Sequence, residues 1–97
     1  MFRLAELSSG NRTASLRIEG DLTRATIPVL EEQLANYARL GVSQVDLEAD
    51  GLLSIDDRAL AEVGSRLPSE LQITFHTSRT AVREQLRGCG FAVVPDS

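Results

Sequence analysis

The stretch VDLEADGLLSIDDRALAEV, residues 45–63, decides the fold class of this chain. Its side chains predict the end of a buried strand, then an acidic loop, and then a helix over residues 57–67. A strand that leads through a loop into a helix is the unit from which α/β domains are built. Asp56 and Asp57 stand where the helix begins. Carboxylates are favoured there, because the unpaired N–H groups of a helix start carry a partial positive charge.

The patterns on both sides of this stretch predict the other elements of one α/β domain. Apolar and polar residues alternate over residues 13–19, which predicts a strand with one solvent-facing side. Residues 20–23 (GDLT) are expected to break that strand, because glycine and aspartate favour turns. Strands are expected at residues 2–7, 13–19, 42–47, 71–76 and 91–94, and helices are expected to begin after Thr26, at Asp57, and after Ser78 or Thr80, and to end at Gly41, Leu67 and Gly88. Residues 1–97 thus predict a single domain with a mixed sheet of about five strands and helices mainly on one face.

Composition narrows the classes of function. The 97-residue chain has a net charge of −4, and all 10 of its basic residues are arginines. Without lysine the chain cannot form a Schiff base or a Walker-type phosphate loop. The arginines are scattered along the sequence, so we expect no nucleic-acid binding. The acidic balance instead favours a protein partner that carries basic residues.

Neither catalysis nor membrane insertion is indicated by the sequence. The one histidine, His76, lies on the polar side of a predicted strand and is remote from Cys89, so no nucleophile and base come together. We therefore expect a non-enzyme without a cofactor. No apolar run is long enough to cross a bilayer, and residues 1–4 do not begin a secretory signal. A single cysteine excludes an internal disulfide, and the expected location is the cytoplasm.

Three segments of the chain, taken in order, resemble the STAS domains of bacterial anti-sigma factor antagonists. Residues 20–23 (GDLT) resemble the family's Gly-Glu-Leu-Asp turn, which precedes the first helix. Residues 45–47 (VDL) and 55–60 (IDDRAL) resemble its Asp-Leu strand and its Ile-Asp-Ser-Ser-Gly-Leu turn. Residues 82–91 resemble its last helix and the glycine exit that follows. Each segment is short, but all three occur in the family's order over nearly the whole chain.

This resemblance implies a regulatory domain that acts by binding a protein. In the family, an anti-sigma factor of the ATPase-kinase type phosphorylates the first serine of the Ser-Ser-Gly turn, and the unmodified form binds that factor and frees sigma. Asp57 occupies the phosphoacceptor position, so we expect the domain to be unswitched or differently switched. The stretch from Asp46 to Ile55 is also about two residues longer than the family pattern. The residues implied to bind the partner are Asp21, Thr23, Ser54, Asp56, Asp57, Arg58 and Ala59.

Several of these residues also have a simpler interpretation. Asp57 is either an ordinary residue of a first helical turn, stabilising it by about 0.3–1 kcal/mol, or a permanent charge that partly imitates phosphoserine. Arg58 is either a surface residue paired with Glu62 or a contact to the partner. Ser54 is either a turn residue or a displaced phosphoacceptor. A different role within the same family is that of an accessory subunit of an ABC-type transporter ATPase.

An alternative of another class is a calcium-binding loop. Residues 46–57 match the spacing of an EF-hand loop, with Gly51 at the sixth place. However, a strand is predicted to enter this loop where an EF-hand has a helix, and the twelfth place carries Asp where Glu is usual. Carboxylates exposed to water at the end of a strand are the simpler interpretation. The oxygen ligands would come from Asp46, Glu48, Asp50, Ser54 and Asp57.

Overall fold

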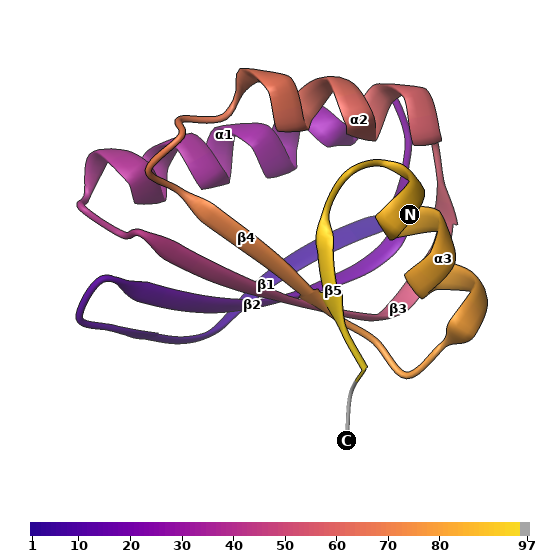
Figure 1. The fold of residues 1–97 in the computed structure, drawn as a ribbon, viewed down its shortest axis with the longest axis horizontal. Helices are drawn as coiled ribbons and strands as arrows, with labels where there is room; N and C mark the ends of the chain where they lie inside the picture. The colour runs from indigo at the N-terminus through magenta and orange to yellow at the C-terminus, as the bar shows by residue number, and fades with distance from the viewer. Residues whose placement is uncertain (96–97) are drawn as a thin grey trace.

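The computed structural model describes residues 1–95 and confirms the predicted order of elements (Figure 1). Five strands and three helices follow one another as β-β-α-β-α-β-α-β. Their bounds are β1 Phe2–Gly10, β2 Thr13–Leu22, α1 Ile27–Arg39, β3 Gln44–Ile55, α2 Asp57–Arg66, β4 Gln72–His76, α3 Thr80–Gly88 and β5 Ala92–Val94. None of the helices in this described part of the chain is long and apolar enough to cross a membrane.

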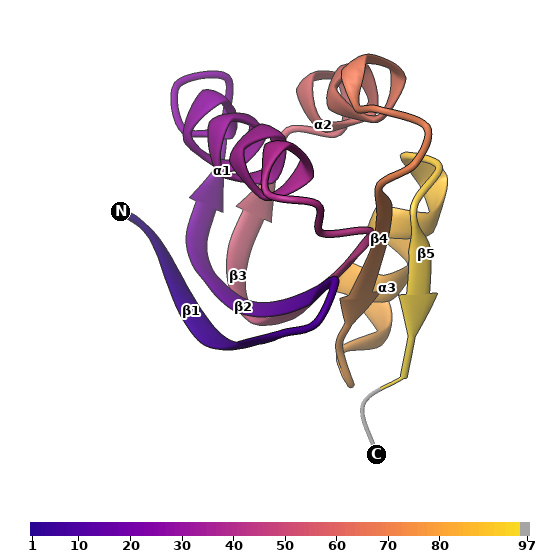
Figure 2. The same ribbon diagram turned by 90° about the vertical axis from the view of Figure 1, so that its left-hand side faces the viewer.

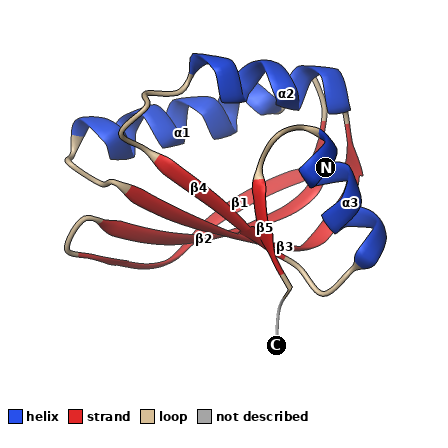
Figure 3. Ribbon diagram, in the orientation of Figure 1, coloured by secondary structure: helices blue, strands red, loops and turns tan. Residues whose placement is uncertain are grey.

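The five strands form one mixed sheet, as the sequence predicted, and their order across it is β1-β2-β3-β4-β5. β1 pairs antiparallel with β2, and the other neighbours are parallel. One helix joins the two strands of each parallel pair. The connections all move across the sheet in the same direction, from β2 toward β5, and right-handed crossovers of this kind place their helices on one face. α1 and α2 lie side by side across this face, and the sheet curves beneath them (Figure 2, Figure 3). α3 lies against the part of β3 that extends beyond the end of β4.

A cluster of apolar side chains fills the space between the helices and the sheet. β2 alternates as predicted, with Leu16 and Ile18 buried and Arg17 exposed. Each helix buries one side, because its apolar residues recur every three or four positions. The opposite face of the sheet is polar. The largest fully buried side chains are Phe75, Leu16, Ile18, Leu22, Leu30, Leu34, Leu47, Leu52, Leu60, Leu86, Val45 and Val63.

The two central strands are longer than the sequence predicted. Residues 20–23 do not break β2 as expected, because the strand continues to Leu22, and β3 continues through the expected acidic loop to Ile55. The physical reason is their parallel pairing, which holds to the last residues of both strands, where Leu22 lies opposite Ile55. Two register shifts each place one additional β3 residue against β2. The segment expected to be a long loop is therefore a bulged strand.

The helix starts combine local signals with tertiary contacts. Thr26 is the N-cap of α1, as predicted, although its hydroxyl donates to the carbonyl oxygen of Asp21 at 2.6 Å and bonds no N–H group of the helix. The predicted cap of α3 was wrong. Arg79, and neither Ser78 nor Thr80, occupies the N-cap position, and its side chain makes no cap bond. Arg79 serves a contact with β3 that no local pattern predicts.

Candidate functional site

Two segments that are far apart in the sequence meet where β2 and β3 end. Residues 20–23 end β2, and residues 54–59 lead from β3 into α2. The N–H of Asp56 donates to the carbonyl oxygen of Leu22 at 2.7 Å, which fixes the start of α2 beside the end of β2. The carboxyl ends of parallel strands meet at one edge of a sheet, where binding sites of open α/β sheets gather. We call the surface formed by Asp21, Thr23, Ser54, Asp56, Asp57 and Arg58 the carboxyl-edge surface.

Asp21 and Ser54 form a polar pair on this surface. The Ser54 hydroxyl donates to Oδ1 of Asp21 at 2.7 Å. That bond, together with the N-terminal ammonium group of Met1 at 3.2 Å from Oδ2, lowers the pKa of Asp21 below its ordinary value. Ser54 is exposed, but its hydroxyl already joins the ends of two strands.

Asp56 has a structural role at the start of α2. Its Oδ1 accepts the N–H of Ala59 at 3.1 Å, and its carbonyl oxygen accepts the N–H of Leu60 at 3.0 Å. These bonds make it the N-cap, and such a side chain stabilises a helix by about 0.5–2 kcal/mol. Ala59 is 4% exposed, so its side chain belongs to the core. The resemblance implied that Ala59 binds the partner, but its side chain is buried and cannot contact one.

Asp57, at the phosphoacceptor position, faces α3. Its Oδ1 accepts a hydrogen bond from Nε2 of Gln85 at 2.8 Å, and the same nitrogen donates to the carbonyl oxygen of Ile55 at 3.1 Å. The Cys89 thiol donates to the carbonyl oxygen of Asp57 at 3.5 Å. Burial, followed by the charge of Asp57, raises the pKa of Cys89. Within residues 1–95 the Asp57 carboxylate bonds no N–H group of its own helix, so its orientation is set by α3.

Sequence reasoning did not place Gln85 and Cys89 at this site. They lie 28 and 32 residues after Asp57 along the chain. The amphipathic pattern of α3 indicates which of its sides is buried, but a pattern within one helix does not specify what that side contacts. Only the docking of α3 against the end of β3 brings these residues to the start of α2.

Thr23 and Arg58 complete the carboxyl-edge surface. The Thr23 hydroxyl oxygen accepts the N–H of Thr26 at 3.3 Å and so shapes the turn into α1. Arg58 is exposed and forms no ion pair within the described residues, so the pair with Glu62 that one of its two interpretations required is not made. Glu62 lies 3.9 Å from the guanidinium of Arg66 instead. The charge of Arg58 is therefore available to a partner.

The loop expected at residues 46–57 for calcium binding is not formed, because residues 46–55 belong to β3. A strand advances about 3.3 Å per residue, so Asp46 and Ser54 are roughly 26 Å apart along it and do not converge on one ion. Residues 1–95 contain no group of three or more His, Cys, Asp or Glu side chains that could hold a metal ion. The acidic side chains of β3 have separate partners, which are His76 for Asp46 (3.0 Å), Arg17 for Glu48 (3.6 Å) and Thr77 for Asp50 (2.7 Å).

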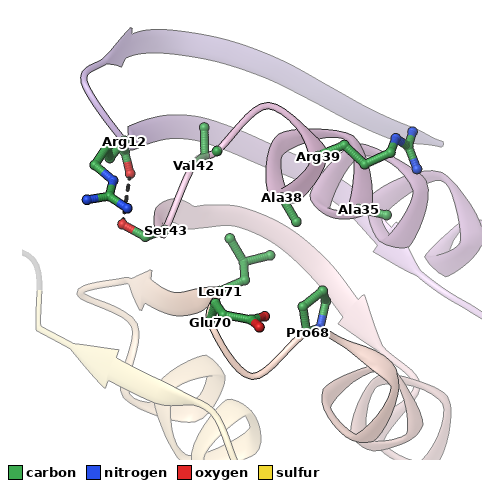
Figure 4. Close-up of a pocket in the computed structure, with 10 residues that line it drawn as sticks. Arg12, Ala35, Ala38, Arg39, Val42, Ser43, Pro68, Glu70 and Leu71 are labelled. Carbon is green, nitrogen blue, oxygen red and sulfur yellow. Dashed lines mark hydrogen bonds between the residues drawn. The ribbon is translucent and has the colours of Figure 1, made fainter.

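A hollow of about 600 Å³ lies at the opposite edge of the sheet (Figure 4). It is open to solvent and is bordered by the turn between β1 and β2, the end of α1 and the loop before β4, which all lie at the amino ends of the parallel strands. Arg12, Arg39 and Glu70 lie around an apolar floor that includes Val42 and Leu71. None of the residues of the carboxyl-edge surface lines this hollow, so the two places are separate.

The element order, the mixed sheet and the placement of the helices are those of the STAS fold. The chain is similar to the solved structure of the anti-sigma factor antagonist SpoIIAA in its unphosphorylated form, with a TM-score of 0.73. The similarity covers 100% of this chain and 89% of the SpoIIAA chain, at 16% sequence identity. No protein-family model and no curated protein matches the sequence. The likeness at this identity shows the fold, and the expected STAS-like architecture is thereby confirmed.

Proposed function

We propose that this domain is a non-catalytic regulator that binds another protein through the carboxyl-edge surface, as an anti-sigma factor antagonist does. The fold supports this proposal, because SpoIIAA shares it over the whole of this chain. The observation that carries it is the bond between Asp57 and Gln85 at 2.8 Å, which holds a carboxylate in one orientation at the start of α2. A side chain that is already held in place loses little conformational entropy when a partner binds, and this strengthens binding.

The partner that we propose is an anti-sigma factor of the ATPase-kinase type in the cytoplasm. Three carboxylates, from Asp21, Asp56 and Asp57, lie on the carboxyl-edge surface together with the guanidinium of Arg58. A partner with basic residues at the matching place would complement this charge and bind faster and more selectively.

Asp57 makes the proposed antagonist unswitched. It has no hydroxyl for a serine kinase, and its single charge is smaller than the roughly −1.5 to −2 of phosphoserine at neutral pH. Because Gln85 holds the carboxylate toward α3, the charge does not stand in the path of a partner in the way a phosphate would. We therefore expect the domain to stay in the binding state.

The test measures binding of the purified chain to each purified ATPase-kinase anti-sigma factor encoded in the same genome, by calorimetry. Asp57→Asn is expected to bind within about tenfold of wild type, because asparagine keeps an oxygen that accepts from Gln85 and removes only one of the three negative charges. Asp57→Lys is expected to weaken binding about a hundredfold, since lysine removes the acceptor of Gln85 and directs a positive charge toward a basic partner. Asp57→Ser is expected to bind and to take up phosphate from the kinase.

Glu70→Lys is the matched control, because it reverses a charge at the opposite edge of the sheet. Binding that is unchanged in Asp57→Lys, together with no phosphate on Asp57→Ser, would contradict the proposal. Selective binding to an ABC-transporter ATPase of the same genome would replace it with the accessory-subunit role.

A further inference from the structure

β3 continues well past its neighbour β4. Their last paired residues are Glu48 and His76, whereas β3 ends at Ile55. Over this extension β3 stays paired with β2 through two bulges. In the second bulge Gly20 lies opposite Leu52 and Asp21 opposite Ser54, so Leu53 has no opposite residue in β2.

At this second bulge the side chain of Leu53 faces solvent. Leu52 is 1% exposed and packs in the core, whereas Leu53 is 70% exposed. Neighbouring side chains of a strand point to opposite faces of the sheet, so Leu53 points away from the core that Leu52 enters. An isolated apolar side chain on a surface is ordinary by itself. Leu40, which is 73% exposed just after α1, is such a residue and lies at the opposite edge of the sheet.

The segment that carries Leu53 is held from both sides. On the side that β4 leaves open, the guanidinium of Arg79 donates to the carbonyl oxygens of Asp50 (3.1 Å) and Leu52. On the side of β2, the hydroxyl of Ser54 donates to Asp21 at 2.7 Å. The backbone around Leu53 is therefore fixed on folding, and a binding partner does not have to order it.

We propose that Leu53 is the apolar anchor of the carboxyl-edge surface and fits an apolar recess on a protein partner. Leu53 directly precedes Ser54 and lies three positions before Asp56, so basic groups beside the recess would meet the carboxylates of this surface. An aliphatic side chain surrounded by charged groups fits a protein with that arrangement better than it fits a nucleic acid or a second acidic copy of this chain. This inference depends on the proposed function in one respect, which is that the partner binds at the carboxyl-edge surface. It does not depend on which protein the partner is.

The experiment places a photo-cross-linking benzoylphenylalanine at position 53 in one variant and at position 40 in another, in cells of the source organism. A cross-linked protein is identified by mass spectrometry, purified, and titrated with wild type, Leu53→Ala and Leu40→Ala. We expect one cross-linked protein from position 53 and none from position 40. We expect Leu53→Ala to weaken binding about tenfold or more, because the leucine loses its buried contact, and Leu40→Ala to leave binding unchanged. Both alanine variants are expected to keep the thermal midpoint of wild type, since both side chains are exposed.

The outcomes separate this inference from the proposed function. If the cross-linked protein is not an ATPase-kinase but binding still depends on Leu53, the anchor stands and the proposed function fails. If an ATPase-kinase binds wild type and Leu53→Ala equally, the proposed function stands and the anchor is wrong. Equal cross-linking from positions 53 and 40, a product made only of two copies of this chain, or no product from position 53, would also overturn the anchor.

Discussion

The side-chain amide of Gln85 lies 2.8 Å from Oδ1 of Asp57 and couples α3 to the first turn of α2. The same nitrogen reaches the carbonyl oxygen of Ile55 at 3.1 Å, so one side chain fixes both the end of β3 and the start of the helix that follows. The start of α2 is therefore held by a tertiary contact in addition to its local cap, Asp56.

Gln85→Glu tests this coupling by placing a second carboxylate against Asp57 and removing the donor to Ile55. We expect the free energy of unfolding at neutral pH to fall by about 1–2 kcal/mol, because a hydrogen bond to a charged group is lost and two like charges meet. Urea denaturation measures this change. Gln72→Glu makes the same chemical change at an exposed strand position and is expected to stay within about 0.5 kcal/mol of wild type. Equal losses in the two variants would show that Gln85 and Asp57 are not coupled.

Three glycine substitutions separate backbone conformation from lack of space. Gly20 has a φ of 96°, and a Cβ there would lie 2.0 Å from the carbonyl oxygen of Met1. Gly41 has a φ of 88° but open space, and Gly88 has open space without a positive φ. In thermal and urea unfolding we expect Gly41→Ala to lose about 1 kcal/mol and Gly88→Ala to be neutral or slightly stabilising. Gly20→Ala is expected to be the most destabilising, because the backbone of β1 must move away. A Gly20→Ala variant as stable as Gly41→Ala would contradict the close approach of the two strands.

The thiol of Cys89 reports on the charge of Asp57. Burial and the neighbouring carboxylate raise the pKa of Cys89, so we expect slow alkylation by iodoacetamide at neutral pH. Asp57→Asn removes the charge but not the burial, so it should lower that pKa part of the way and speed alkylation at a given pH. The measurement is the alkylation rate of folded protein as a function of pH. Asp56→Asn is the control, because it removes a charge one residue away and keeps a capping oxygen. If both variants alkylate at the wild-type rate, the charge of Asp57 does not act on Cys89.

Asp50 joins β3 to the turn between β4 and α3, and this contact contributes to stability in acid. Hydrogen bonds from the Thr77 hydroxyl and the N–H of Ser78 lower the pKa of Asp50 in the folded chain. Its contribution is therefore complete above the ordinary aspartate pKa of about 3.9 and is lost as pH falls through the lower folded value. The asparagine of Asp50→Asn keeps an accepting oxygen but does not titrate. Below about pH 4, the free energy of unfolding of this variant should therefore fall less steeply with pH than that of wild type. Urea unfolding at a series of acidic pH values compares the two slopes, and identical slopes would show that Asp50 contributes nothing to acid unfolding.

The sequence predicted the order of the elements because the signals for helices and for alternating strands are local. The alternation over residues 13–19 and the helix start at Asp57 were both found where they were expected. The two misplaced loops, at residues 20–23 and within residues 46–55, fell on segments that each contain an adjacent glycine and aspartate. Such residues favour turns when taken alone, but pairing with a neighbouring strand overrides that preference. In this chain the pairing of β2 with β3 keeps both segments extended to Leu22 and Ile55.

The sequence by itself determined the class of fold, since alternating strands and amphipathic helices are local patterns. It also suggested residues 20–23 and the acidic start of the second helix as parts of a candidate surface. Only the tertiary structure decided how that surface is built. It buries the side chain of Ala59, turns Asp57 toward Gln85, and exposes Leu53 on a bulge. Each of these facts depends on contacts between residues about thirty or more positions apart, or on the register of two strands. Periodicity within one element carries no information about such contacts, because they arise only when β2, β3 and α3 pack together.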